Sequence, residues 1–287
     1  MQGGFSTGGV RRTQSGTIAR TARCNPLRPL RDRRAKTFAS RILSAQPMQA
    51  LRSLIFNVLF FAWIAGLGVP ALPLIVLPRR VAWAVVKLWA RGVLWLLAHV
   101  VGLDYVVRGR EHLPAGAAIV AAKHQSAWDT IIFLVLLGDP AYVLKRELFK
   151  IPIYGWFTWK LDMIGIDRAA GPSALKRLAA RAQPAVAAGR PLVIFPQGTR
   201  TAPGARRPYL PGVYALYAAA KVPVVPVALN SGTFWGRRRF LKRPGRIVLE
   251  YLPALPPGLD RRRFMAELEQ RIETATAALE ASGGSCG

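Results

Sequence analysis

The sequence predicts an α/β domain with a mixed β-sheet flanked by helices, preceded by an N-terminal hydrophobic helical membrane hairpin. Two observations support this prediction. The stretch Leu54–Leu77 contains 24 residues without a charge, which is long enough for a helix to cross the hydrocarbon layer of a bilayer. From about Leu103 onward, short apolar segments alternate with helical ones, and this alternation is typical of an α/β domain with a largely buried sheet.

Residues 1–50 are expected to form a disordered basic leader. They are rich in Gly, Ser, Thr and Arg and show little apolar periodicity, so they bury too little surface to offset the loss of chain entropy. An Arg-rich leader is typical of a transit peptide, but upstream sequence read from a wrong start codon would look the same. Met48 directly precedes the hydrophobic segment, and we favour it as an alternative start.

Residues 51–101 are expected to form the membrane-associated helical hairpin. Glycines and prolines between Gly66 and Pro73 interrupt the apolar stretch, and arginines flank both of its ends. Because basic residues prefer the cytoplasmic side of a membrane, a segment that enters, turns and returns would satisfy both flanks. The following stretch, Val81–Val101, carries three tryptophans and is typical of an amphipathic helix at headgroup level. The sequence leaves open whether the hairpin spans the bilayer or re-enters it.

Residues 102–281 are expected to form the α/β domain, and residues 282–287 a flexible tail. Short apolar runs predict strands at Asp104–Arg108, Ala117–Ala122, Ala141–Lys145, Leu192–Phe195, Val222–Leu229 and Ile247–Tyr251. Longer stretches with helical periodicity predict helices at Trp128–Leu137, Ser173–Ala188, Gly212–Ala220 and Arg261–Ala281.

The balance of charged and apolar residues restricts the partners of this chain. Its formal charge of +27 fits either nucleic acid or an anionic lipid surface, whereas a hydrophobic content of 52% favours membrane contact. No nucleic-acid-binding module is recognisable, so we expect no nucleic-acid partner. The two cysteines, Cys24 and Cys286, lie in tail-like sequence and provide neither a disulfide framework nor a Cys-based metal site.

An imidazole and a carboxylate follow the predicted strand Ala117–Ala122. His124 falls in the turn after the strand, and Asp129 in the first turn of the next helix, where the helix dipole favours a carboxylate. An Asp that accepts a hydrogen bond from one imidazole nitrogen leaves the other nitrogen free as a general base. The alternative is a structural histidine near a helix cap. Ser126 lacks the glycine-elbow context of a nucleophile and is interpreted as a capping residue.

A glycine-bent loop, Phe195–Arg200, follows another predicted strand. Gly198 lets the backbone approach a ligand closely, and Arg200 can bind a phosphate with two hydrogen bonds. Further cations follow other strand-like runs, at Lys145 and Arg168. Because ligand sites gather at the C-terminal ends of strands, we expect an anion pocket beside the His–Asp pair. An exposed loop arginine is the alternative interpretation of Arg200.

Over residues 52–252 the chain resembles the 1-acyl-sn-glycerol-3-phosphate acyltransferases and their glycerolipid acyltransferase relatives. The resemblance rests on four motifs in the order of that family. They are the His-x-x-x-x-Asp motif at His124–Asp129, a second motif at Gly165–Arg168, a third at Phe195–Arg200 and an apolar strand with a proline at Val222–Val227.

The resemblance implies transfer of a fatty acyl group from acyl-CoA or acyl-carrier protein to the sn-2 hydroxyl of lysophosphatidic acid, giving phosphatidic acid. It implies that His124 is the general base and that Asp129 orients it, with no metal and no bound cofactor. A related acyltransferase acting on lyso-ornithine lipid or glycerol 3-phosphate is the alternative. The residues expected to bind the phosphate and glycerol of the substrate are Lys145, Arg168, Gln197, Gly198, Thr199 and Arg200.

Two departures from the family pattern fall at these motifs. Gln197 stands where the family usually has Glu, so it keeps an acceptor but loses the charge. Lys123 replaces the Asn that commonly precedes the His, and is expected to place a cation beside the base. From the family pattern we expect Gln197→Glu to keep substantial activity.

The implied substrates lie in a bilayer, so we expect a membrane protein whose active site faces the cytoplasm, in a bacterial inner membrane. Trp156 and Trp159 are interpreted either as the rim of an acyl-chain entrance or as core residues. The run Arg237–Arg239, with Lys242 nearby, is expected to lie against anionic headgroups, with a solvated loop as the alternative. The expected partners are the lysophospholipid, the acyl thioester, an anionic membrane surface and, as an alternative donor, acyl-carrier protein.

Overall fold

The computed structural model describes residues 31–167 and 171–283, without the side chains of residues 31–46 and 172. The strands are β1 (Leu103–Arg108), β2 (Ile119–Ala122), β3 (Ala141–Lys145), β4 (Ile164–Ile166), β5 (Leu192–Ile194), β6 (Val224–Leu229) and β7 (Gly245–Tyr251). The α-helices are α1 (Arg31–Gly68), α2 (Arg79–Leu96), α3 (Trp128–Leu136), α4 (Tyr154–Lys160), α5 (Gly171–Ala187), α6 (Gly212–Ala220), α7 (Ser231–Phe234) and α8 (Arg261–Gly283). Short 3-10 or π-helical segments are η1 (Leu72–Val76), η2 (Leu97–Val101), η3 (Arg110–His112) and η4 (Arg146–Lys150).

The strands form one mixed sheet in the order β1-β7-β6-β2-β5-β3-β4. Neighbouring strands are parallel, apart from β6 and β7, which run antiparallel. The strands β2, β3, β4, β5 and β6 therefore end at the same edge of the sheet. This edge is where the predicted α/β domain should place its ligand site.

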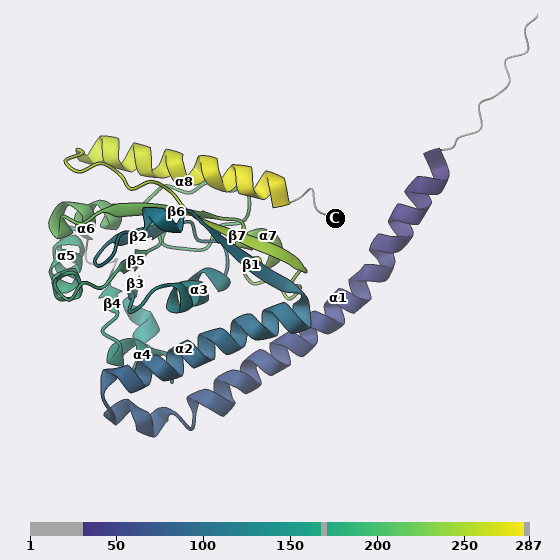
Figure 1. The fold of residues 1–287 in the computed structure, drawn as a ribbon, viewed down its shortest axis with the longest axis horizontal. Coiled ribbons are helices and arrows are strands. Elements are labelled where there is room, and N and C mark those ends of the chain that lie inside the picture. Colours follow the sequence, from purple (N-terminus) through teal and green to yellow (C-terminus); the bar gives the residue numbers. More distant parts are fainter. Residues whose placement is uncertain (1–30, 168–170, 284–287) are drawn as a thin grey trace, which may run out of the picture. The chain divides into compact units, whose positions relative to one another are not determined.

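Helices cover both faces of the sheet (Figure 1). On one face, α5, α6 and α8 enclose a core that includes Leu178 and Phe264. On the other, α2 and α3 enclose a second core that includes Trp83 and Phe133. Successive residues of β2 point alternately into the two cores, so every residue of this strand is buried. Burial on both faces explains why the central strands are uninterrupted apolar runs in the sequence.

The predicted elements of the α/β domain are confirmed to within about two residues at each end. The sequence did not predict β4, because three residues with a glycine in the middle give little apolar signal. It also missed α4, whose aromatic residues are weak helix formers, and the single-turn α7.

Contacts divide the chain into residues 1–43 and a second unit of residues 44–287. Residues 1–30 of the expected leader lie outside the described residues, so disorder there stays a prediction. Residues 31–50 are helical instead, because α1 begins at Arg31. The physical reason is that Ala and Arg, the two commonest residues in this part, are good helix formers.

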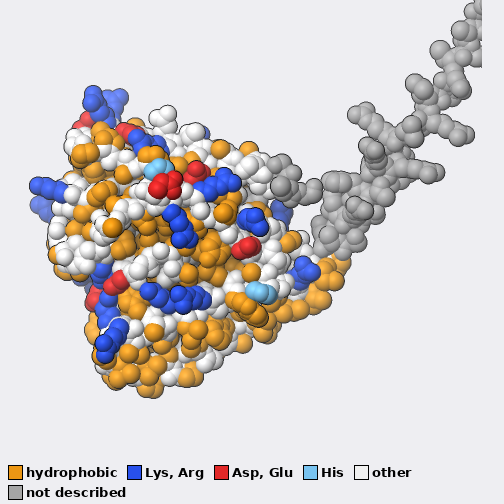
Figure 2. Space-filling model, in the orientation of Figure 1, with side chains coloured by type: hydrophobic (Ala, Val, Ile, Leu, Met, Phe, Trp, Pro, Cys, Tyr) orange, Lys and Arg blue, Asp and Glu red, His pale blue; other side chains and the backbone are white. Residues whose placement is uncertain are grey.

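Two helical segments near the N-terminus are long and apolar enough to cross a membrane, Pro47–Gly68 and Arg79–Val101. The break between them coincides with the glycines and prolines of the apolar stretch and contains η1. Large apolar side chains on these segments are exposed, among them Val58, Phe61 and Trp95. Hydrophobic side chains accordingly gather on the surface over α1 and α2 (Figure 2).

Lys242 joins the loop before β7 to α1. Its backbone N–H donates to Ser53 Oγ (3.0 Å), and its Nζ donates to Asn57 Oδ1 (2.5 Å). The ammonium lies 5.3 Å from the ring centre of Phe56 and 5.6 Å from that of Trp235. Lys242 is only 3% exposed, so the prediction that it lies against lipid headgroups is wrong. Aromatic rings and an amide oxygen surround its charge instead.

Candidate active site

The candidate site lies on the edge where the parallel strands end. The chain leaves β2 toward His124, β5 toward the loop Phe195–Arg200, and β6 toward Ser231. Because β2 pairs directly with both β5 and β6, the residues that follow these three strands are brought close together. The sheet thus joins two sequence motifs that are far apart along the chain.

Asp129 is the centre of a hydrogen-bond network. Its side chain is completely buried in the first turn of α3. Oδ2 lies 3.0 Å from Nδ1 of His124 and accepts the backbone N–H groups of Gln125 (2.6 Å) and Ser126 (2.8 Å). Oδ1 accepts the Ser231 hydroxyl at 2.5 Å. These contacts satisfy both carboxylate oxygens and fix the direction in which Asp129 faces the imidazole.

His124 is held by its ring, its Nδ1 and its backbone carbonyl. The ring stacks on Phe195, with the ring centres 4.0 Å apart and the planes at 20°. The carbonyl accepts the backbone N–H of Thr201 (2.8 Å) and its hydroxyl (3.1 Å). A carboxylate only accepts, so Nδ1 carries the proton that faces Asp129, and in the neutral imidazole Nε2 is then the nitrogen without a proton. Nε2 forms no hydrogen bond within the described part of the chain, and the side chain keeps 13% of its surface exposed.

Arg200 provides a cation next to this pair. The loop before it turns at Gly198, whose N–H donates to Phe195 O (2.8 Å) and whose φ of 64° would strain any other residue. Burial lowers the pKa of the Arg200 guanidinium, the charge of Arg237 lowers it further, and the charge of Asp129 raises it. Among the described residues, none forms a hydrogen bond or an ion pair with the guanidinium. Arg200 is therefore half-buried, positively charged and available to an anion.

The other predicted phosphate ligands lie on the same edge or outside the described residues. Lys145 ends β3 and is exposed. Gly198 and Thr199 are partly exposed in the loop after β5. Arg168 lies outside the described residues, immediately after the segment that follows β4. The structure thus brings Lys145 and Arg200 to one edge with His124, and Arg168 stays a prediction.

Known proteins share sequence with most of this chain. The model of the acyltransferase family matches residues 104–230. The chain is 36% identical over 231 residues to a 1-acyl-sn-glycerol-3-phosphate acyltransferase of Pseudomonas aeruginosa, covering 79% of this chain and 89% of that protein. The chain belongs to the 1-acyl-sn-glycerol-3-phosphate acyltransferase family.

More distant members of the family agree in sequence and in fold. The human 1-acyl-sn-glycerol-3-phosphate acyltransferase alpha is 29% identical over 205 residues, covering 70% of this chain and 72% of that protein. The crystal structure of the 1-acyl-sn-glycerophosphate acyltransferase PlsC from Thermotoga maritima superimposes with a TM-score of 0.66 at 23% identity, covering 81% of this chain and 98% of that one. The two proteins therefore share the fold, including the mixed sheet.

Two departures from the family pattern are explained by contacts with α8. Lys123 is 2% exposed, and its Nζ donates to both carboxylate oxygens of Glu273, at 2.7 and 2.6 Å. Lys123 thus adds a cation next to His124 in the chain, as expected, but its charge is paired with the carboxylate of Glu273. Gln197 is also buried, with its amide between Glu273 (3.3 Å) and the Thr201 hydroxyl (3.3 Å). These contacts favour a positioning role for Gln197 over a contact with substrate.

Sequence reasoning missed Ser231 and Glu273. A signal existed for Ser231, because it follows the end of the predicted strand Val222–Leu229, at the edge where polar residues are expected. Glu273 is harder to find, because it is one of several acids on α8 and only its place beside the buried Ile272 distinguishes it. Ser126 was interpreted as a capping residue, and its hydroxyl does accept the backbone N–H of Trp128 at 3.2 Å.

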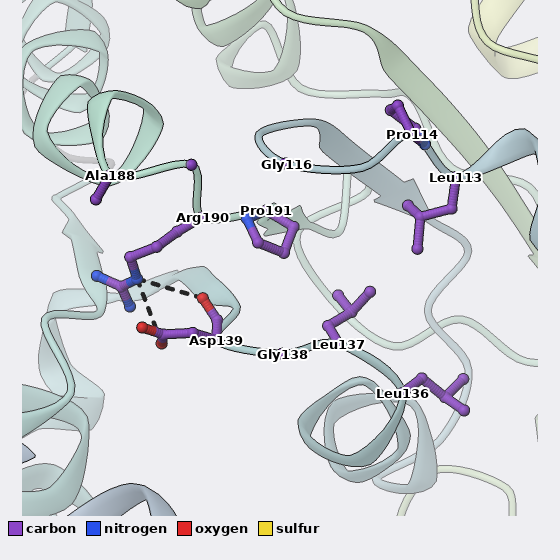
Figure 3. A pocket seen from close by; sticks show the side chains of 11 residues that line it. Leu113, Pro114, Gly116, Leu136, Leu137, Gly138, Asp139, Ala188, Arg190 and Pro191 are labelled. Carbon is purple, nitrogen blue, oxygen red and sulfur yellow. Dashed lines mark hydrogen bonds and ion pairs between the residues drawn. The ribbon is translucent and has the colours of Figure 1, made fainter. Parts of the chain in front are cut away.

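A pocket of about 350 Å³ lies at the opposite ends of the strands (Figure 3). Its lining comes from the segments that lead into β2, β3 and β5, and includes Leu137, Asp139 and Arg190. Arg190 points toward Asp139, and its Nε lies 3.3 Å from both the backbone carbonyl and Oδ1 of that residue. The charged side chains that line this pocket thus pair with each other. In the described part of the chain, no group of three or more His, Cys, Asp or Glu side chains could hold a metal ion.

Proposed function

We propose that the protein transfers a fatty acyl group from an acyl thioester to the sn-2 hydroxyl of lysophosphatidic acid, giving phosphatidic acid. The observation that carries this proposal is the arrangement of His124. Its Nδ1 is bound by a buried carboxylate, and the charge of the nearby Arg200 acts on the same carboxylate. Neither Nε2 of His124 nor the guanidinium of Arg200 is paired within the described residues. Membership of the family and the name of the relative from Pseudomonas aeruginosa support the same substrate.

The reaction follows from these positions. His124 Nε2 takes the proton of the acceptor hydroxyl while the hydroxyl oxygen forms a bond to the thioester carbonyl carbon. Asp129 stabilises the resulting imidazolium. The carbon–sulfur bond then breaks, and the leaving thiolate receives the proton from His124. The thioester is already activated, so the proposed reaction requires neither a covalent acyl-enzyme nor a cofactor.

Cations on the same edge of the sheet would hold the phosphate of the acceptor. Arg200 is half-buried, and its fork of N–H groups suits two hydrogen bonds to a phosphomonoester. Lys145 and Arg168 complete this proposed phosphate site. Such contacts position the acceptor rather than take part in bond formation.

We propose that the protein works at the cytoplasmic surface of a membrane. Trp156 and Trp159 on α4 are 48% and 69% exposed, so their alternative interpretation as core residues is wrong. α4 contacts α2 and η1, and exposed apolar residues continue across these elements. Tryptophan prefers the membrane interface, where an enzyme could reach a lipid acceptor and a water-soluble donor.

The test is an acyl-transfer assay on the purified protein in vesicles. The acceptors are lysophosphatidic acid, lyso-ornithine lipid and glycerol 3-phosphate. The donors are acyl-CoA and acyl-carrier protein that is loaded with a fatty acyl group. We expect lysophosphatidic acid to be the best acceptor. We expect His124→Ala to lower kcat by about 10²–10⁴-fold, the range for loss of a general base. The control is His99→Ala, which removes an exposed histidine of η2.

Two results would contradict the proposal. Preference for another acceptor would assign the site to a different member of the superfamily. Wild-type turnover by folded His124→Ala would show that this imidazole is not the base.

A further inference from the structure

We propose that Glu273 on α8 is a positioning residue for the turn that carries His124. We also propose that the neutral amide of Gln197 suits the negative charge of Glu273. In this protein the buried carboxylate that contacts the Phe195–Arg200 loop is that of Glu273 on α8. A second negative charge at position 197 cannot be accommodated. This inference rests on the proposed function where it concerns turnover, but its structural part does not.

Glu273 receives hydrogen bonds from three side chains, which come from two segments of the chain. Lys123 Nζ contacts both carboxylate oxygens, and Tyr209 OH (2.9 Å) and Gln197 Nε2 (3.3 Å) donate to Oε1. Lys123 comes from the end of β2, and Gln197 and Tyr209 come from the chain between β5 and α6. Glu273 is 8% exposed, so this carboxylate is a buried junction between α8 and both halves of the site.

Two short routes connect the Glu273 carboxylate to His124. Lys123 directly precedes His124 in the chain. Gln197 Oε1 lies 3.3 Å from the Thr201 hydroxyl, and Thr201 holds the carbonyl oxygen of His124. Removing the carboxylate would therefore remove side-chain support from both of these routes to His124 without touching the imidazole or the substrate.

A further acid on α8 strengthens the same connection. Glu280 Oε1 accepts from the side chain of Gln125 at 2.5 Å, and Glu280 Oε2 accepts from the backbone N–H of Gly204 at 2.9 Å. The other end of the Gln125 amide accepts the N–H of Gly232 at 3.0 Å. At Gly232 a side chain would meet Gln125 Cβ at 2.9 Å, so glycine is required for this approach. α8 thus supports Lys123 and Gln125, the residues on either side of His124.

The charges around Glu273 decide which residue fits at position 197. The cluster contains one cation, Lys123, one anion, Glu273, and two neutral donors, so it carries no net charge. A glutamate at position 197 would place a second carboxylate about 3.3 Å from the first, where the charge of Lys123 is already used. We therefore expect Gln197→Glu to lose activity, contrary to the expectation drawn from the family pattern.

The experiment is a double-mutant cycle of wild type, Gln197→Glu, Glu273→Gln and the double variant. The double variant exchanges the amide and the carboxylate across one hydrogen bond, so it keeps Lys123 and the net charge. For each protein we would measure the melting temperature, kcat and the KM for lysophosphatidic acid. The control is Glu267→Gln, the same change in a surface pair with Arg271 on the same helix.

We expect each single variant to lose at least tenfold in kcat and to melt at a lower temperature, with KM changed less than twofold. We expect the double variant to recover most of both losses, and the control to lose neither. If neither single variant folds, a folded and active double variant would demonstrate the same coupling. Losses that add in the double variant, or wild-type kcat in Gln197→Glu, would overturn the proposal.

The pH profile supplies a readout that loss of packing alone would not change. In Gln197→Glu, one of the two facing carboxylates should take up a proton as the pH falls and restore the hydrogen bond. The charged or titratable groups that face this pair are Lys123, Tyr209 and Glu269. We therefore expect the melting-temperature deficit of Gln197→Glu to narrow from pH 8 to pH 6, and a constant deficit would contradict the pairing.

The two proposals can fail separately. Absence of acyl transfer by the wild type, with all acceptors, would reject the proposed function. The melting temperatures would still show whether the two positions are coupled.

Discussion

At the scale of single residues, the site depends on how one buried carboxylate is shared. Asp129 accepts hydrogen bonds from an imidazole, two backbone N–H groups and a hydroxyl. The backbone donors fix the turn between β2 and α3, and the side-chain donors connect it to His124 and to Ser231 after β6. One residue therefore both shapes the turn and orients the imidazole of His124, the proposed base.

Removal of the Ser231 hydroxyl should weaken this orientation. In Ser231→Ala, Asp129 Oδ1 loses its 2.5 Å hydrogen bond in a buried site. We expect a loss of about 1–2 kcal/mol in the free energy of unfolding. We also expect a several-fold lower kcat with an unchanged KM, because Asp129 can then rotate away from His124. Chemical denaturation and steady-state kinetics would measure these, with Thr233→Ala on the same helix as the control. An unchanged kcat would show that the backbone donors alone fix Asp129.

The proposed role of Arg200 predicts a different kinetic result. Arg200→Ala should raise the KM for lysophosphatidic acid by about tenfold or more and lower kcat less, since a positioning contact is lost. The control is Arg207→Ala, which removes an exposed cation of the following segment. A fall in kcat without a change in KM would instead assign Arg200 to the transition state.

At the scale of elements, two helices are attached to the α/β domain by buried polar side chains. α1 precedes the sheet in the chain, and α8 follows it. α8 contacts the site through Glu273 and Glu280, whereas α1 is attached through Lys242 and the aromatic residues around it. The attachment of α1 places a buried lysine beside a helix that is otherwise largely exposed and apolar. It therefore connects the hydrophobic helices to the loop that precedes β7.

The attachment of α1 should depend on pH. Burial lowers the pKa of Lys242 from its ordinary value of 10.5 to about 8. Between these two values the unfolded chain binds a proton that the folded protein has released, so stability contributed by this group rises as the pH increases. Below about pH 8 the lysine is charged in both states, and its burial costs stability.

Thermal melts between pH 7 and pH 9.5 would test this dependence. We expect the melting temperature of the wild type, relative to Lys242→Met, to rise over this interval. The control is Lys150→Met, which replaces an exposed lysine. A difference between wild type and Lys242→Met that stays constant with pH would contradict the lowered pKa.

At the scale of the whole molecule, the apolar surface and the site belong to one proposed activity. The hydrophobic helices expose apolar side chains, and α4 extends this surface with two tryptophans. An enzyme with a lipid acceptor gains from such a surface, because it restricts the search for substrate to the plane of the membrane. The charge of +27 would add attraction to anionic lipids.

The double variant Trp156→Ala/Trp159→Ala tests this surface. We expect weaker binding to anionic vesicles and a several-fold higher KM for lysophosphatidic acid presented in them, because two interfacial anchors are lost. A short-chain, water-soluble lysophosphatidic acid serves as the control substrate, and its KM should not change. The melting temperature should stay near that of the wild type, since both side chains are exposed. Unchanged vesicle binding would exclude α4 from the membrane surface.

The sequence by itself determined most elements of the α/β domain and the two motifs that are proposed to carry the chemistry. Apolar periodicity is a local property, so it predicted the long helices of this domain and every described strand except β4. The motifs at His124–Asp129 and Phe195–Arg200 are likewise local in the sequence. The hydrogen bond between His124 and Asp129 was also predictable, because the two residues are close in the chain and flank one turn.

Only the tertiary structure decided which distant residues complete the site. Ser231 and Glu273 are brought there by the strand order and by the packing of α8, and neither leaves a local pattern that identifies its partner. Lys123 and Lys242 show the same limit, because a lysine in a sequence is read as an exposed cation. Whether it is buried depends on the presence of a carboxylate or an aromatic ring from a segment more than a hundred residues away.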